Sequence, residues 1–88
     1  MTQNKTKVQT VEIIKMKFVP ANLTVEKGDK VVLINKDFLV HDVTDELKHS
    51  WSSKPLKQGD SYSKIITKNE SYYCSLHQVM KGSIHIKD

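Results

Sequence analysis

The stretch Cys74-Ser75-Leu76-His77-Gln78-Val79-Met80 places a thiolate, an imidazole and a thioether three positions apart in the last quarter of the chain. All three come from scarce residue types, because the chain has one cysteine, four histidines and three methionines. On a tight loop a three-residue step brings side chains back to a common point, whereas a strand sends alternate positions to opposite faces. The stretch therefore predicts a metal site built on a loop.

The softness of these ligands indicates which metal they suit. A thiolate with a thioether suits copper(I), and imidazole suits both copper(I) and copper(II). A second imidazole is offered by His41, which lies 33 positions before Cys74 (74 minus 41) in the apolar stretch 38–44 that we expect to form a strand. Two histidines, one cysteine and a weak axial methionine are the donor set of a blue-copper electron-transfer centre.

Other interpretations of the same residues stay open. A free cysteine or methionine is commonly a core hydrophobe, and a histidine in an apolar stretch is commonly a hydrogen-bonded core residue. Structural zinc usually recruits more cysteines and rarely methionine. A nucleophilic pair of Cys74 and His41 would match protease chemistry in residue types alone, and so short a chain offers little substrate cleft. The joint spacing favours metal binding.

Length and charge fit a small carrier better than an enzyme. With 88 residues, the chain 1–88 is expected to be a single domain with one modest core. Fourteen lysines and ten acidic residues give a net charge of +4, which favours acidic protein partners. The lack of arginine argues against nucleic acid as a partner. A single cysteine excludes an intramolecular disulfide, so packing and hydrogen bonds must hold the fold.

No targeting or membrane segment is visible in the sequence. No stretch approaches the length of a membrane span, so we expect no membrane insertion. Residues 1–7 are polar, lack the apolar core of a signal peptide and are expected to be a flexible N-terminal tail. The chain is then either cytoplasmic or a mature form whose leader has been replaced by an initiator methionine.

Short apolar or alternating stretches between turn signals predict an all-β domain. The expected strands and strand-like stretches are 8–14, 16–20, 23–26, 30–35, 39–44, 62–67, 71–74 and 83–87. Because no helical period separates them, we expect an antiparallel β-sandwich. Strand 30–35 is β-branched and apolar, which suits a strand buried inside the sandwich. Segment 45–61 is long for a connection and holds the only tryptophan, Trp51, so we expect it to be packed by its own side chains or to hide a short extra element.

Two histidines are not expected at the metal site. In the last strand Ile84 and Ile86 alternate with His85, so the isoleucines should face the core and His85 the solvent. His49 lies within the long connection and is excluded for that reason.

These residues match a family pattern, and the chain resembles the small blue copper proteins, the cupredoxins, in particular the plastocyanin and amicyanin group. The resemblance runs from about Val11 to Lys87. It is carried by four motifs: Phe18-x-Pro20-x-x-Leu23-x-Val25-x-x-Gly28-Asp29, Val40-His41-Asp42-Val43, Leu56-x-x-Gly59-x-Ser61-Tyr62 and Tyr73-Cys74-Ser75-Leu76-His77-x-x-Met80-Lys81-Gly82. The two-residue gaps of Cys74-x-x-His77-x-x-Met80 look like the short ligand loop of amicyanin.

The resemblance implies an eight-stranded Greek-key sandwich with one copper ion held by His41, Cys74, His77 and Met80. It also implies that the upstream histidine is buried and that the loop histidine reaches the surface through an apolar patch, for which Leu39, Leu76 and Val79 are candidates. The implied function is one-electron transfer, without enzymatic activity, between redox proteins such as a c-type cytochrome, an oxidase or a dehydrogenase docking near His77. A periplasmic or other extracytoplasmic location and a monomeric state are implied too. A module that stores or delivers copper without electron transfer is the alternative.

Three positions depart from the pattern of that family. The residue after the first histidine is commonly asparagine and here is Asp42, so the link between the two ligand segments should be weaker or pH-sensitive. The proline often found beside the loop histidine is replaced by Leu76 and Gln78, which should leave the loop less rigid. Glu70 stands where a tyrosine is usual, which should affect a strand corner more than the metal.

Overall fold

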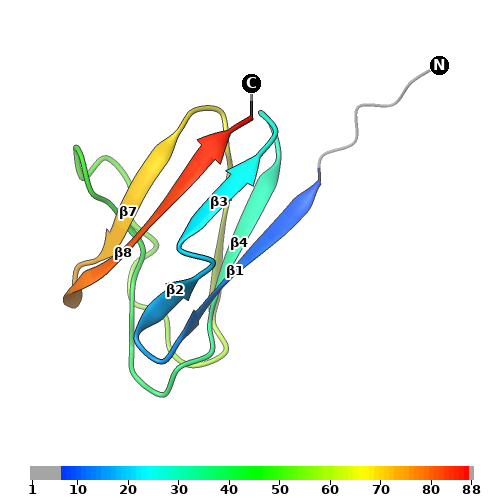
Figure 1. Ribbon diagram of the computed structural model, residues 1–88. Coiled ribbons are helices and arrows are strands. Elements are labelled where there is room, and N and C mark those ends of the chain that lie inside the picture. Colours follow the sequence, from blue (N-terminus) through cyan, green and yellow to red (C-terminus); the bar gives the residue numbers. More distant parts are fainter. Residues whose placement is uncertain (1–6, 88) are drawn as a thin grey trace.

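Residues 7–87 of the computed structural model form eight strands and, within this range, no helix (Figure 1). The strands are β1 Val8–Ile14, β2 Lys17–Val19, β3 Asn22–Val25, β4 Lys30–Asn35, β5 Thr44–Asp45, β6 Ser61–Ile65, β7 Glu70–Cys74 and β8 His77–Ile86. No helix in the described range is long and apolar enough to cross a membrane. The tail expected at residues 1–7 lies outside the described residues except for Lys7, whose backbone N–H donates to Asp29 Oδ1 at 3.3 Å.

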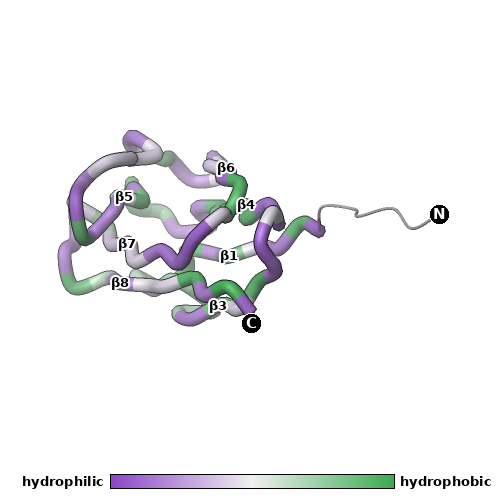
Figure 2. The backbone as a smooth tube through the Cα atoms, turned by 90° about the horizontal axis from the view of Figure 1, so that it is seen from above, coloured by the Kyte–Doolittle hydropathy of each residue, from purple (hydrophilic) through white to green (hydrophobic). Residues whose placement is uncertain are grey.

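Two four-stranded sheets pack face to face, so the predicted all-β sandwich is confirmed. One sheet has the order β2-β1-β4-β6 and the other β3-β8-β7-β5, and the two layers are visible from above (Figure 2). β4 lies between β1 and β6, and its residues Val31 and Leu33 are buried, as its β-branched and apolar sequence predicts, while the polar Asn35 is buried too. The count of eight strands agrees with the cupredoxin resemblance.

The expected antiparallel pairing holds for four of the six strand pairs in the described range, while each sheet also contains one parallel pair. β1 runs parallel to β4, and β3 runs parallel to β8. The cause is the short connection Pro20-Ala21, across which the chain passes from β2 in one sheet to β3 in the other without reversing direction. β4 therefore returns beside β1 in the same direction as β1.

The core lies between the two sheets and includes two of the candidate ligands. Cys74 is fully buried and Met80 is 3% exposed. Their buried apolar neighbours are Val11, Ile13, Phe18, Val25, Val31, Leu33, Val43, Leu56, Ile66, Tyr72 and Ile84. Phe18 meets Tyr72 edge to face, with ring centroids 4.9 Å apart. Part of the candidate site therefore lies within the hydrophobic core.

The segment around His41 is not the strand 39–44 that the sequence predicts. Only Thr44–Asp45 is a strand, and His41 forms an isolated bridge with Leu56. The amide of Asn35 explains the irregular path, because its Nδ2 donates to the carbonyls of Leu39 at 2.9 Å and Leu56 at 2.8 Å. A side chain thus satisfies backbone acceptors that a ladder would otherwise pair.

Other predicted boundaries shift by a few residues. β8 begins at His77 rather than at residue 83, and the strand expected over 62–67 ends at Ile65. The connection 46–60 holds no helix or named strand, and bridges pair Thr44 with Ser52 and His41 with Leu56. Its Trp51 stacks on Tyr62 of β6, with ring centroids 6.0 Å apart, so this side chain packs the segment against the neighbouring strand.

Candidate metal centre

Cys74 and His77 face each other across a hairpin. Cys74 ends β7, a two-residue turn of Ser75 and Leu76 follows, and His77 begins β8 as the cross-strand partner of Cys74. The next pair in the ladder is Tyr73 with Lys81, so residues 78–80 are extra on β8 and the register shifts there. Such a bulge changes the direction in which the neighbouring side chains of the strand point.

His41 comes from the loop between β4 and β5 and is fully buried. Its backbone is fixed by two hydrogen bonds, from His41 N to the Leu56 carbonyl at 3.1 Å and from Leu56 N to the His41 carbonyl at 2.7 Å. The imidazole therefore points into the core from a segment that is itself anchored to the long connection.

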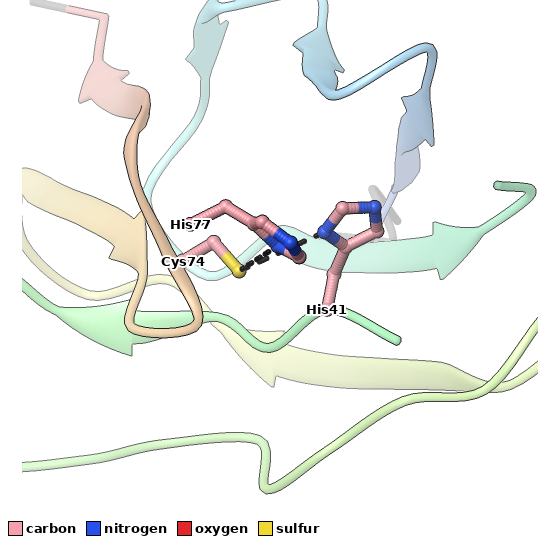
Figure 3. Close-up of side chains that lie close together, drawn as sticks. All are labelled: His41, Cys74 and His77. Atoms are coloured by element: carbon pink, nitrogen blue, oxygen red, sulfur yellow. Dashed lines mark hydrogen bonds between the residues drawn. The ribbon is translucent and has the colours of Figure 1, made fainter. Parts of the chain in front are cut away.

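The structure brings His41, Cys74 and His77 together, as Figure 3 shows. Cys74 Sγ lies 3.7 Å from His41 Nδ1 and 3.8 Å from His77 Nδ1. The three candidate ligand atoms lie within 4.8 Å of one another. With the bond lengths of zinc, a metal of similar size, of about 2.3 Å to sulfur and about 2.0 Å to nitrogen, these separations suit one ion bonded to Sγ and a nitrogen at an angle of about 120°. That angle is the one expected of a trigonal site with two histidines and one cysteine.

The orientation of the His41 ring is set by Asp37, a residue that the sequence analysis missed. His41 Nε2 lies 2.9 Å from Asp37 Oδ2, so the imidazole has Nδ1 free on the side of Cys74. The hydrogen bond from His41 lowers the pKa of Asp37 below its usual value, and backbone N–H groups of Met16 and Phe38 act in the same direction. A signal for this contact was present in the sequence as a carboxylate four residues before the histidine.

Asp42 joins the two ligand segments, although the sequence predicts a weak link at this position. The Asp42 carboxylate accepts the backbone N–H of Ser75 at 2.7 Å and also the Ser75 hydroxyl. Its own backbone N–H donates to Cys74 Sγ at 3.4 Å. Thr44 Oγ1 donates to the same carboxylate at 3.2 Å. An ionised aspartate cannot donate a hydrogen bond, so Ser75 and Thr44 provide the donors for this link.

Met80 is buried in the hydrophobic core that also contains Cys74, and its role as a ligand stays a prediction. His85 is exposed while Ile84 is buried, as the alternation in the last strand predicts. His49 is exposed and stacks on Tyr73 with ring centroids 5.8 Å apart. Neither His49 nor His85 belongs to the cluster around Cys74.

Exposed apolar side chains lie on the two segments that carry His41 and His77. Leu39, Leu76 and Val79 were predicted for this surface and are 49%, 51% and 90% exposed. The structure adds Phe38 and Val40, which are 87% and 39% exposed and belong to the stretch 38–44 that was expected to form a strand. We call these five residues the apolar patch.

The sequence matches the family described as copper binding proteins, plastocyanin/azurin family, over residues 5–87. Comparison with curated proteins gave no match. Among solved structures, the reduced Cu(I) form of an amicyanin mutant at pH 4 is 27% identical, with a TM-score of 0.81, and 98% of this chain and 86% of that chain are covered. A purple cupredoxin from Nitrosopumilus maritimus is 21% identical with a TM-score of 0.83 over 90% of this chain and 99% of that one, which shows the shared fold.

An enzyme is also among the similar structures. The copper-containing nitrite reductase from Thermus scotoductus SA-01 is 26% identical over 91% of this chain, with a TM-score of 0.81. The present chain spans only 22% of that enzyme.

Proposed function

The chain belongs to the plastocyanin/azurin family of copper-binding proteins, and from this premise we propose that it is a mononuclear type 1 copper protein carrying single electrons between redox proteins. The observation that carries this proposal is the position of the Cys74 thiol between two imidazole nitrogens, at 3.7 and 3.8 Å. Thiolate and imidazole donors in a trigonal arrangement are the defining part of a blue-copper site.

We propose that His41 Nδ1, Cys74 Sγ, His77 Nδ1 and the thioether of Met80 would hold the copper ion. A bound copper ion would supply the chemistry by alternating between Cu(I) and Cu(II). The protein contributes a site whose ligands are already close together and held by hydrogen bonds, so a change of oxidation state needs little movement. Burial of His41 and Cys74 keeps water away from the site, which limits solvent reorganisation.

His77 is the proposed point of electron exchange, since it is partly exposed while His41 is fully buried. The apolar patch lies on the two segments that carry these histidines. It offers a docking surface from which water is easily displaced and on which few ion pairs need to form. Such a surface suits a partner that must bind briefly and leave. The net charge of +4 favours an acidic redox protein, such as a c-type cytochrome, an oxidase or a dehydrogenase, and we propose that the carrier works as a monomer.

We propose that the protein acts as a carrier rather than an enzyme, in the periplasm or another extracytoplasmic compartment. The similarity to a nitrite reductase covers a small part of that enzyme and supports the fold and the copper site rather than its reaction. A copper store or copper-delivery module would use the same donor set. The two functions differ in whether the bound ion exchanges electrons reversibly while it stays bound.

The test is electron exchange by the copper-loaded protein. Voltammetry should show a reversible one-electron couple, and stopped-flow mixing with an acidic c-type cytochrome should show fast exchange that slows as salt is added. Copper release on reduction, or the lack of a reversible couple, would favour the delivery module instead.

A matched pair of surface variants tests the docking site. Val79→Ser should slow the exchange severalfold and leave the potential unchanged, because it removes an apolar contact outside the ligand set. Leu47→Ser is the control, because Leu47 is also apolar and is 76% exposed. Leu47 follows Glu46, whose backbone N–H donates to the Ser71 carbonyl near the start of β7, whereas Cys74 lies at the end of β7. Equal rates in the two variants would argue against docking at the patch.

A further inference from the structure

The carboxylate of Asp37 is held in place by three donors, two from its own loop and one from the turn between β1 and β2. Oδ2 accepts the backbone N–H of Met16 at 3.1 Å and lies 2.9 Å from His41 Nε2, while Oδ1 accepts the backbone N–H of Phe38 at 3.0 Å. The side chain is only 15% exposed. Since both oxygens are engaged, the carboxylate has a fixed position behind the His41 ring.

The turn between β1 and β2 is shaped to make this contact. Lys15 and Met16 both have positive φ, 51° and 64°, although neither is glycine, asparagine or aspartate. Two left-handed residues define the tight hairpin turn that matches the twist of paired strands. In this turn the N–H of Met16 points at Asp37, so the hairpin and the loop of His41 are joined through one carboxylate.

The contact fixes the proton on His41. A carboxylate accepts hydrogen bonds, so the neutral His41 ring carries its proton on Nε2 and leaves the Nδ1 lone pair facing Cys74. Carboxylate partners of this kind orient a metal-binding histidine and make the ring a stronger donor.

Within residues 7–87, neither His77 nor Asp42 takes part in a contact of this kind between a carboxylate and a ligand ring. Among the described residues His77 has no carboxylate in hydrogen-bond contact, and its Nδ1 contacts Cys74 Sγ. Asp42 is close to the site as well, but its oxygens accept from Ser75 and Thr44 rather than from a ligand ring. Asp37 is therefore the carboxylate that acts directly on a proposed ligand.

We propose that Asp37 is a positioning residue that acts through His41 to favour copper(II) over copper(I) and so lowers the reduction potential of the carrier. The inference rests on the proposed function. The extra positive charge of the oxidised site is stabilised by the nearby carboxylate and by a more basic imidazole. The ring of His41 is also fixed in position, because Asp37 contacts its Nε2 and Cys74 contacts its Nδ1.

Three variants of the full chain test the assignment. Asp37→Asn keeps the size and one acceptor but removes the charge, and Asp37→Ala removes the hydrogen bond too. Asp60→Asn is the matched control, since Asp60 loses the same charge and accepts the backbone N–H of Lys57 rather than a ligand ring. The urea stability of each apo-protein shows whether it is folded.

The first readout is the reduction potential of the copper-loaded protein. Asp37→Asn should shift the preference between oxidation states about tenfold toward copper(I), which is ~59 mV upward for one electron. Asp37→Ala should in addition weaken copper(II) binding about 10- to 100-fold. Potentials of both Asp37 variants equal to that of Asp60→Asn would overturn the proposal.

The second readout needs no copper. Nitrogen-15 NMR of the apo-protein at a pH where the histidines are neutral should show His41 as the Nε2–H tautomer in the native chain and as a mixture in Asp37→Ala. A mixture already present in the native chain would overturn the positioning role. This measurement tests the role of Asp37 without copper. A copper-loaded protein with no reversible couple would reject electron transfer but would leave the tautomer result for His41 unaffected.

Discussion

The carboxylate of Asp42 holds Ser75 through two hydrogen bonds, one from the backbone N–H at 2.7 Å and one from the hydroxyl. Asp42 follows His41 and Ser75 follows Cys74, so this pair fixes two proposed ligands relative to each other. The backbone N–H of Asp42 also donates to Cys74 Sγ. The spacing of the ligands is thus set by the protein before any ion binds.

Replacing Asp42 should weaken the fold as well as the site. Asp42→Ala leaves the backbone N–H of Ser75 without its acceptor, so we expect the apo-protein to lose about 1–3 kcal/mol of unfolding free energy. Asp42→Asn should lose less, because its amide oxygen can still accept from Ser75. Urea unfolding of the apo-proteins measures both, and equal losses in the two variants would contradict the role of the hydrogen bonds.

Met80 should tune the copper site without being needed to form it. Met80→Leu keeps the apolar volume and is expected to cost less than about 1.5 kcal/mol of stability. The variant should still bind one copper, because His41, Cys74 and His77 remain, but its visible spectrum and potential should change with loss of the axial sulfur. If spectrum and potential stay those of the native protein, Met80 is a packing residue only.

Gly82 should tolerate no side chain, because of its distance from Tyr72. A Cβ added at Gly82 would lie 2.6 Å from Cε1 and Cζ of the Tyr72 ring, and that ring is fully buried. We expect Gly82→Ala to reduce the unfolding free energy by about 1–3 kcal/mol. Ser83→Ala, in the neighbouring position of β8, is the control and should have a smaller effect. If Gly82→Ala unfolds at the same melting temperature as the native protein, the Tyr72 ring must move aside to make room for the Cβ.

Asp45 should make stability depend on acid pH. Hydrogen bonds from the hydroxyl and N–H of Ser50 hold the pKa of Asp45 at about 2, below its ordinary 3.8. Because the pKa is lower in the folded chain than in the unfolded one, its contribution is fully present above about pH 4 and is lost as the pH falls toward 2. Asp45→Asn should therefore lose less stability over this window than the native chain. Urea unfolding at pH 6 and at pH 2.5 tests this, and parallel losses in both chains would refute it.

The burial of Tyr72 suggests a stabilising change. Its hydroxyl has no hydrogen-bond partner among the described residues, and burial raises the pKa of the phenol. Tyr72→Phe removes a buried polar group that gains nothing from folding, so we expect equal or higher stability, by up to about 1 kcal/mol. A loss of stability in the urea midpoint would indicate that the hydroxyl has a partner after all.

The sandwich and the approach of His77 to Cys74 could be predicted because they depend on local patterns, whereas His41, 33 positions before Cys74, was proposed from its residue type. The continuous apolar and β-branched run of β4 indicated a strand inside the sandwich, and the spacing of Cys74 and His77 indicated a tight loop. The parallel pairs could not be predicted in this way, since strand direction depends on a change of sheet at Pro20-Ala21 rather than on periodicity.

The environment of His41 was missed for a different reason. Its apolar neighbours Phe38, Leu39 and Val40 have strand-like composition, but they are exposed on an irregular loop whose carbonyls are bound by the Asn35 amide. The contact of Asp37 with His41 depends on that same loop. Hydrogen bonds of single polar side chains leave no periodic pattern of apolar residues in a sequence, so the carboxylate four residues before His41 was not recognised as its partner.

The most direct test of the account is a copper(II) titration of the apo-protein followed by visible absorption, with Cys74→Ser as the control. We predict an intense thiolate-to-copper band in the native chain that saturates at one copper per chain and is lost in the control. Binding without that band, or an equal band in Cys74→Ser, would contradict a type 1 site formed by Cys74 with His41 and His77.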